Sequence, residues 1–208
     1  DLEKLFNESK NGVIYFSMGS NLQSNDMTTE MKQSLLKMFG KLKETVIWKF
    51  EGELENVPNN VHLLKWAPQQ SILAHSNLKF FITHGGQLST TEAIHFGVPV
   101  IGLPMLGDQY VNMRAVQNKG FGIMVQLREE LADDLNMAID KMLKDPTYTT
   151  TAKHLSSIYH DRPVSPGTEI VHWTEHVVKT GGAPHLRSSA LLVPLYQKLY
   201  LDYFALII

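Results

Sequence analysis

The sequence predicts an α/β fold in which a doubly wound parallel sheet is followed by C-terminal helices. Short uncharged runs rich in aromatic and β-branched residues, such as 80–83 and 98–103, are typical of strands buried on both faces. Between these runs apolar residues recur at helical spacing, so strands and helices alternate up to Thr147. This alternation indicates parallel strands joined by right-handed crossovers. A chain of 208 residues, 43% of them hydrophobic, is long enough to bury such a core.

The first half of the chain provides three expected strands and two expected helices. Each strand is a short apolar run, and the first ends at a Gly19-Ser20 turn. The first helix is indicated by Met and Leu residues at helical spacing, and the second by Pro68, whose missing N–H is tolerated in a first helical turn. In chain order these elements are strand 13–17, helix 28–41, strands 46–50 and 61–65, and helix 68–74.

The second half provides three more strands and five helices. Ser89-Thr-Thr-Glu92 has the spacing of a capping box and predicts a helix start at about Ser89. Asp108 and Gly120 suit the N-cap and the end of the next helix. Trp48 and Trp173 lie within apolar patterns, which predicts core positions. In chain order these elements are strand 80–83, a helix from Ser89, strand 98–103, helix 109–119, strand 121–126, a helix over 131–143, and helices 147–159 and 168–179.

The stretch 80–109 predicts a ligand site. The His84-Gly85-Gly86 turn allows the backbone to approach a ligand closely, because glycine has no Cβ. A helix start directly after it offers free N–H groups and the positive end of the helix dipole to an anion. Ligands of open α/β sheets bind at the carboxyl ends of strands, so the polar residues after these two strands are expected to share one crevice. They are His84, Ser89, Glu92, Asp108 and Gln109.

Composition and spacing argue against several other functions. A net charge of −2 does not favour a nucleic-acid partner, and the lack of cysteine excludes disulfides and thiolate metal sites. Gly120-Phe-Gly122 precedes a strand instead of following one, so it is not a dinucleotide fingerprint. His172 and His176 stand four residues apart, but neither a third ligand nor the glutamate position of a zinc protease motif accompanies them. No metal is therefore expected.

Several motifs resemble the UDP-glycosyltransferase family over nearly the whole chain. The signature residues are Phe81-Ile82-Thr83-His84, Gly86, Ser89, Glu92, Pro99, Pro104 and Asp108-Gln109. The segments 11–20, 65–69 and 184–187 also resemble this family, and the stretch from His84 to Glu92 is most similar to its insect members. The resemblance implies the C-terminal half of a membrane-bound animal enzyme of the GT-B fold. It further implies a Rossmann-like donor-binding domain over 1–180 and a tail over 181–208 that leads to a transmembrane span.

The end of the chain and one surface triplet agree with this membrane interpretation. The apolar run 204–208 is far shorter than the ~20 residues that cross a bilayer, and we interpret it as the start of a span. The segment 190–204 is rich in Leu and Tyr, which suits a membrane interface or ordinary core packing. Asn7-Glu-Ser9 is a glycosylation sequon, compatible with a position on the lumenal side of the endoplasmic reticulum membrane.

The resemblance also implies a role for each residue of a donor-binding set. His84 would contact the diphosphate, Ser89 a phosphate and Glu92 the ribose hydroxyls. Trp66 would stack on uracil, whose edge would meet the backbone of Ala67 and the amide of Gln69. Leu88 replaces an asparagine of many relatives, which leaves Ser89 and backbone amides to contact phosphate. The full set is Ser17, Gly19, Ser20, Trp66, Ala67, Gln69, His84, Gly86, Ser89, Glu92, Asp108 and Gln109.

Purely structural explanations remain open for the same residues. His84 could cap its strand end, and Ser89 with Glu92 could form only the capping box. Residues 17–20 could form a plain turn near which no phosphate binds. Asp108 could be only a helix cap, although the resemblance assigns it, with Gln109, to the hydroxyls of the donor sugar.

The resemblance implies an inverting transfer of a hexose, with glucose as the expected sugar, from a UDP-sugar to a small lipophilic acceptor. The general base would lie in an N-terminal acceptor-binding domain, so no catalytic residue is expected in these 208 residues. No Asp-x-Asp pair is present, which fits a reaction without a metal cofactor. The expected partners are the UDP-sugar, the N-terminal domain, the acceptor and a membrane, and no nucleic acid. A module that binds nucleotide sugars without catalysis is the alternative.

Overall fold

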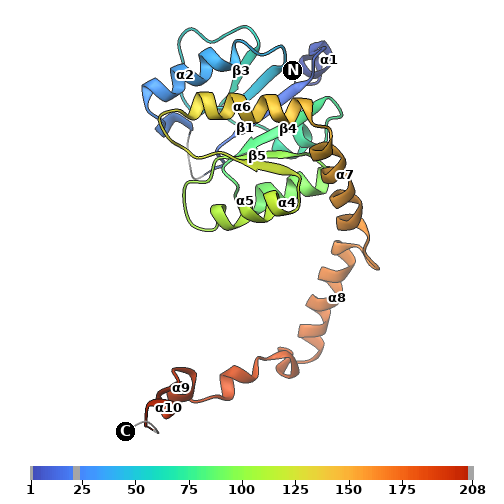
Figure 1. The fold of residues 1–208 in the computed structure, drawn as a ribbon. Helices are drawn as coiled ribbons and strands as arrows, with labels where there is room; N and C mark the ends of the chain where they lie inside the picture. The colour runs from blue at the N-terminus through green and yellow to red at the C-terminus, as the bar shows by residue number, and fades with distance from the viewer. Residues whose placement is uncertain (1, 21–23, 206–208) are drawn as a thin grey trace. The chain divides into compact units, whose positions relative to one another are not determined.

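The structure, a computed structural model, describes residues 2–20 and 24–205, which fall into two units. The first unit ends at Asp161 and the second begins at Arg162. All the strands of the described residues belong to the first unit, whereas the second unit is helical (Figure 1).

The first unit is built on a six-stranded parallel sheet with the order β3-β2-β1-β4-β5-β6. The strands are β1 (Val13–Ser17), β2 (Thr45–Lys49), β3 (Val61–Leu64), β4 (Leu78–Thr83), β5 (Val100–Gly102) and β6 (Gly122–Met124). The two central strands, β1 and β4, are in register from Ile14 opposite Phe80 to Ser17 opposite Thr83. The strand order reverses between them, which opens a crevice beyond their carboxyl ends. The predicted α/β fold with a doubly wound, Rossmann-like sheet is confirmed.

One face of the sheet is covered by α2 (Thr29–Phe39) and α6 (Leu131–Lys144) (Figure 1). Their apolar sides meet strand residues that are buried between the layers. Trp48 lies at the centre of this core, fully buried as predicted, with its ring stacked on Phe16 at a centroid distance of 5.1 Å. Its indole N–H donates to Ser24 Oγ at 3.1 Å, so the polar group is satisfied inside the core.

The opposite face carries α3 (Gln69–Leu73), α4 (Gln87–Phe96), α5 (Gln109–Asn118) and α7 (Thr147–His160). Tyr15 and Phe81 from the two central strands stack there with ring centroids 4.9 Å apart. The helix α1 (Leu2–Glu8) was not predicted, and Phe6 anchors it by stacking on His75 at 3.9 Å. A short helix with one buried residue has no sequence periodicity strong enough to be recognised.

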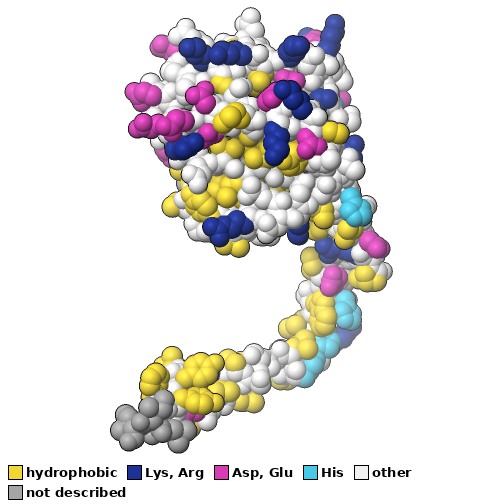
Figure 2. Space-filling view, in the orientation of Figure 1, with side chains coloured by type: hydrophobic (Ala, Val, Ile, Leu, Met, Phe, Trp, Pro, Cys, Tyr) yellow, Lys and Arg dark blue, Asp and Glu magenta, His cyan; other side chains and the backbone are white. Residues whose placement is uncertain are grey.

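The second unit contains α8 (Pro166–Lys179), two short 3-10 helices, η2 (Pro184–Leu186) and η3 (Ser189–Leu192), and the helices α9 (Leu195–Lys198) and α10 (Leu201–Ala205). In Figure 2, histidines gather along α8, and hydrophobic side chains dominate near α9 and α10. Trp173 on α8 is 45% exposed, so its predicted core position is wrong. In the described part of the chain no helix has the length and apolarity to cross a bilayer. The predicted tail extends beyond this part, to residues 206–208.

Two predictions about helix starts need correction. Ser89 is not an N-cap, because α4 begins at Gln87 with Gly86 at the cap position and without a side-chain cap. Asp108 does occupy the position before α5, but its carboxylate caps no backbone N–H there and accepts instead from the Asn112 side chain at 2.8 Å. Predicted strand ends differ by a few residues, most at β5 and β6. Val98, Pro99 and Leu103 lie outside β5, and Phe121, Val125 and Gln126 lie outside β6.

Candidate functional site

A cavity of about 530 Å³ lies beyond the carboxyl ends of β1 and β4. All the site residues predicted from the sequence line it except Asp108, which is exposed nearby. The predicted residues in the lining are Ser17, Gly19, Ser20, Trp66, Ala67, Gln69, His84, Gly86, Ser89, Glu92 and Gln109. Tyr15, Lys49, Gln87 and Leu88 also line the cavity, and the sequence analysis missed them as site residues. The fold therefore brings together side chains from five separate segments, whereas their contacts with a ligand remain predictions.

The imidazole of His84 lies in a slot between two glycines. A Cβ on Gly19 would lie 2.6 Å from His84 Cε1, and a Cβ on Gly86 would lie 2.4 Å from His84 Nε2. Real Cβ atoms do not come so close to ring atoms, so glycine at both positions is a requirement of the packed ring. The slot fixes the ring plane at the cavity wall.

The ring of His84 is neutral near pH 7. Burial lowers the pKa of His84 below its usual 6.5, and the nearby carboxylate of Asp108 raises it by a smaller amount. Its Nδ1 is buried and has no hydrogen-bond partner among the described residues. A neutral imidazole carries one N–H, so His84 can donate one hydrogen bond into the cavity from a fixed position.

The N-terminus of α4 faces the cavity through Gly86, Gln87, Leu88 and Ser89. The first intrahelical bond runs from the Thr90 N–H to the Gly86 carbonyl at 3.0 Å. The N–H groups before Thr90 have no carbonyl available within the helix. Because no side chain caps them, this end of the helix can donate to an anion. Leu88 is 81% exposed and contributes only its backbone to such a contact.

Glu92 lies one turn further along α4 and accepts hydrogen bonds from α3. Its two carboxylate oxygens accept from Gln69 Nε2 at 2.6 Å and from Gln70 Nε2 at 2.9 Å. Gln69 Nε2 also approaches Ser89 Oγ at 3.4 Å. The predicted capping box does not form, because Glu92 is turned away from the helix start toward the glutamines.

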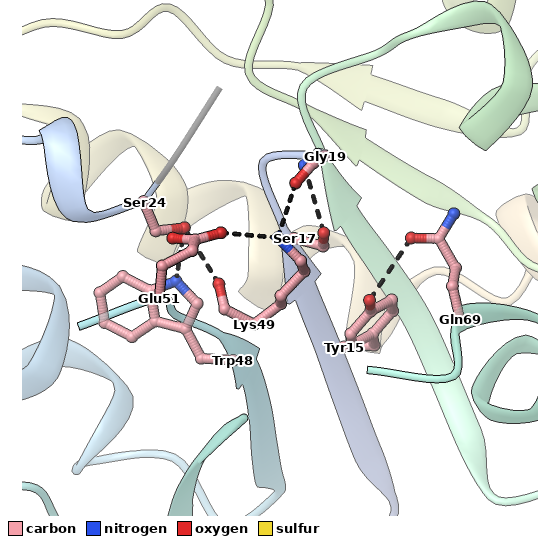
Figure 3. Close-up of polar contacts among 8 residues, drawn as sticks. All are labelled: Tyr15, Ser17, Gly19, Ser24, Trp48, Lys49, Glu51 and Gln69. Atoms are coloured by element: carbon pink, nitrogen blue, oxygen red, sulfur yellow. Dashed lines mark hydrogen bonds and ion pairs between the residues drawn. The ribbon is translucent and has the colours of Figure 1, made fainter. Parts of the chain in front are cut away.

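Tyr15 holds the other end of the Gln69 amide at the cavity floor. Its hydroxyl donates to Gln69 Oε1 at 3.4 Å (Figure 3). The pKa of Tyr15 is raised to about 12, mainly by burial. The hydrogen bond with Ser17 acts against this increase, and the charge of Glu92 adds to it. The hydroxyl therefore stays protonated and remains a donor at any physiological pH. With its oxygen toward Tyr15 and its nitrogen toward Glu92, the Gln69 amide has a defined orientation.

Lys49 connects three parts of the cavity wall (Figure 3). Its Nζ donates to the Gly19 carbonyl at 2.8 Å and pairs with Glu51 Oε1 at 2.6 Å. The same Nζ lies 5.6 Å from the centroid of the Trp66 ring, within cation–π range. The Lys49 side chain is only 7% exposed and that of Glu51 20%. Glu51 Oε2 is buried and lacks a hydrogen-bond partner among the described residues.

Trp66 presents a large free aromatic surface at the cavity. It follows β3 and is 72% exposed. Lys49 approaches the ring through Nζ, whereas the exposed surface can stack on a planar ligand. The contrast with the buried Trp48 shows that position relative to a strand end, and not residue type, separates the two tryptophans.

The loop after β5 is fastened to the His84 turn by Asn112. Asn112 Nδ2 donates both to Asp108 Oδ2 at 2.8 Å and to the Gly85 carbonyl at 3.0 Å. Gln109 Oε1 accepts from the backbone N–H groups of Met105 and Leu106 at 2.8 and 3.0 Å. The carbonyl end of Gln109 is thus used to shape the loop, and its amide nitrogen is left for a ligand at the cavity edge.

One of the missed residues carried a detectable signal. Lys49 is the charged last residue of β2 and follows an apolar run, whereas Tyr15 lies in the middle of β1 and carried no such signal. Polar atoms that end buried strands of a parallel sheet lie at the ligand-binding edge. Asn112 and Gln70 carried no such signal, because both lie on polar helix faces.

The histidines of α8 do not form a recognisable metal site. His176 Nε2 and His185 Nε2 lie 2.9 Å apart, and the rings of His172 and His176 are 6.2 Å apart by centroid. Over the described ranges there is no group of three or more His, Cys, Asp or Glu residues with the geometry to hold a metal ion.

Comparison with known proteins gives a consistent result. The family model described as "UDP-glucoronosyl and UDP-glucosyl transferase" matches residues 1–208. The chain is 43% identical to UDP-glycosyltransferase UGT5 of Dactylopius coccus, covering 100% of this chain and 40% of that protein. It is 37% identical to UDP-glucosyltransferase 2 of the same organism, covering 97% of this chain and 39% of that protein. The solved structure of the spinosyn forosaminyltransferase SpnP has the same fold, with a TM-score of 0.72 at 18% identity over 85% of this chain and 46% of that one.

Proposed function

This chain belongs to the UDP-glucoronosyl and UDP-glucosyl transferase family, and from that membership we propose that it is the donor-binding part of an inverting hexosyltransferase. The chain spans about two fifths of the length of the curated relatives that it matches. The proposal therefore includes an N-terminal domain that binds the acceptor. The observation that supports it best is a single cavity with an anion-binding helix end and a free indole ring in its lining.

The diphosphate is assigned to the His84 side of the cavity. The N–H groups at the start of α4 and the imidazole N–H of His84 donate to phosphate oxygens, and the turn at Ser17, Gly19 and Ser20 is next to them. Lys49, paired with Glu51, donates to the Gly19 carbonyl at 2.8 Å and so holds this turn in place. These groups are fixed before the ligand binds, so they stabilise the charge that develops on the leaving diphosphate without a metal cofactor.

The nucleoside and the sugar are assigned to opposite ends of the cavity. Uracil stacks on the exposed Trp66 ring, next to the backbone of Ala67, and Glu92 accepts from the ribose hydroxyls. Asp108 and the amide nitrogen of Gln109 bind the hydroxyls of the hexose. We propose glucose as the sugar, in line with the name of the second relative, UDP-glucosyltransferase 2.

In the proposed reaction, the general base and the acceptor site lie outside this chain. A base in the N-terminal domain removes the proton from the hydroxyl or carboxyl group of a small lipophilic acceptor. The acceptor oxygen attacks the anomeric carbon of the hexose, the bond from that carbon to the diphosphate oxygen breaks, and UDP leaves. The attack comes from the opposite side, so the anomeric configuration is inverted. Such an enzyme would act in conjugation and detoxification, held by a C-terminal span at the lumenal face of the endoplasmic reticulum membrane.

The proposal is tested by calorimetric titration of the folded chain with UDP, UDP-glucose and the glucuronic acid donor. We expect UDP to bind, UDP-glucose to bind better than the glucuronic acid donor, and no turnover by this chain alone. His84→Ala should weaken binding of all three ligands, and Lys144→Ala on the outer face of α6 should leave binding unchanged. A folded chain that binds none of them would refute the proposal. Turnover by the full-length enzyme separates a transferase from a module that only binds nucleotide sugars.

A further inference from the structure

Two consecutive glutamines of α3 hold the carboxylate of Glu92. Gln69 Nε2 and Gln70 Nε2 donate to different oxygens of this carboxylate, at 2.6 and 2.9 Å. Gln69 lines the cavity, whereas Gln70 is exposed at the surface and is not part of the lining. Gln70 therefore acts on the cavity only through Glu92.

The short helix α3 is a firm support for these two amides. Ile72 and Leu73 are each 1% exposed and anchor α3 in the hydrophobic core. The Tyr15 hydroxyl approaches the Gln69 amide oxygen from the other side, at 3.4 Å. Among the described residues, the Gln70 side chain makes no second hydrogen bond, and its bond to Glu92 Oε1 at 2.9 Å sets the position of that carboxylate oxygen.

A glutamate on a helix surface otherwise has several rotatable bonds and many conformers. Two donors on different oxygens fix both the direction and the plane of the carboxylate. Each oxygen accepts more than one hydrogen bond, so the remaining lone pairs keep a defined direction toward the cavity. Hydroxyl groups of a ligand then meet acceptors that need no rearrangement on binding.

We propose that Gln70 is a positioning residue for recognition of the ribose, acting by alignment of the Glu92 carboxylate. This inference rests on the proposed function, in which Glu92 accepts from the ribose hydroxyls. Gln70 touches no ligand, and its effect is limited to the hydroxyl-dependent part of the affinity.

The test compares UDP with its dideoxy analogue, which lacks both ribose hydroxyls, in calorimetric titrations of the whole chain. We expect Gln70→Ala to weaken UDP binding about 3- to 10-fold, the effect of one hydrogen bond to a charged group that is partly exposed to water. Binding of the dideoxy analogue should not change. Gln70→Glu keeps the shape of the side chain, removes the donor and places a second carboxylate beside Glu92, so it should lose at least as much of the preference for UDP.

Controls separate alignment from loss of structure. Gln117→Ala, an exposed glutamine on α5, should leave both affinities unchanged. Thermal unfolding of each variant reports its folding, and the ratio of the two affinities within one folded sample is independent of the active fraction.

Three outcomes would overturn the inference. If Gln70→Ala and Gln70→Glu keep the wild-type preference for UDP, Gln70 has no positioning role while the proposed function stands. If the two variants weaken the binding of UDP and of the dideoxy analogue equally, the substitution disturbs the structure in general and not the alignment of Glu92. If the folded wild-type chain binds neither ligand, or does not distinguish them, the proposed function or its ribose assignment has failed first.

Discussion

The ion pair between Lys49 and Glu51 is the most informative single target in the cavity wall. Lys49→Met keeps the aliphatic length and removes the charge. It leaves the carboxylate of Glu51 and the carbonyl of Gly19 without their partner, in a place where the two charged side chains are 7% and 20% exposed. Loss of one member of a buried pair costs ~3–5 kcal/mol, because the other charge remains desolvated.

The exposure of Glu51 places the expected loss at the lower end of that range, about 3 kcal/mol in the free energy of unfolding. For a unit of this size the loss corresponds to a decrease in Tm of about 6–12 °C. Glu51→Gln alone should also be destabilising, because Lys49 then loses its counter-ion. The double variant should recover about 2 kcal/mol relative to the sum of the single variants, since neither charge is left alone.

Urea unfolding followed by circular dichroism gives these free energies, provided that the slope against urea is the same for all variants. Lys144→Met is the matched control, because its pair with Asp140 has a similar distance of 2.7 Å but side chains that are 75% and 58% exposed. It should cost no more than about 0.5 kcal/mol. If Lys49→Met is equally mild, or if the single effects simply add in the double variant, the pair is screened by water and the reasoning is wrong.

Three further predictions concern the slot, the histidines and the core. Gly86→Ala should weaken UDP binding strongly, because the new Cβ would lie 2.4 Å from the His84 ring and displace it. Gly167→Ala is the control, since its Cβ meets only Ser165 Oγ at 4.0 Å. Equal UDP affinities of the two variants in calorimetry would refute the prediction. Burial lowers the pKa of both His84 and His62 in the folded chain. As the pH falls below about 6.5, the unfolded chain therefore binds more protons than the folded chain, and the free energy of unfolding should decrease between pH 7 and pH 5. A smaller decrease in the His84→Asn variant would support this, and an unchanged pH profile would contradict it. Trp48→Ala should cost ~3–5 kcal/mol in urea unfolding, because it removes a fully buried ring from the core, and a loss below 1 kcal/mol would refute that packing role.

The sequence alone determined the fold class and most of the cavity lining. Strands buried on both faces require continuous apolar runs, and a parallel sheet requires helices between them, so both are visible in a one-dimensional pattern. The carboxyl ends of such strands meet at one edge, which is why His84, Glu92 and Gln109 could be assigned to one crevice before their distances were known. Trp66 was assigned to the same site through the family resemblance.

Sequence reasoning failed where one local pattern allowed two structures. Ser89-Thr-Thr-Glu92 fits a capping box, but Glu92 instead accepts from two amides that lie far from it in the chain, at Gln69 and Gln70. Trp173 follows the same apolar periodicity that buried helices show, yet it lies exposed on α8. In both cases the deciding contact, or its absence, is not local.

Tertiary structure alone decided how the cavity groups are held. Three contacts join residues that are far apart in the chain: the bond from Lys49 to the Gly19 carbonyl, the packing of His84 against Gly19, and the bond from Asn112 to the Gly85 carbonyl. The positions of strands and helices can be predicted from the pattern of apolar and polar residues, because buried positions select apolar residue types. The direction of a polar side chain depends on which donor the fold brings within 3 Å, and a sequence pattern does not contain that information.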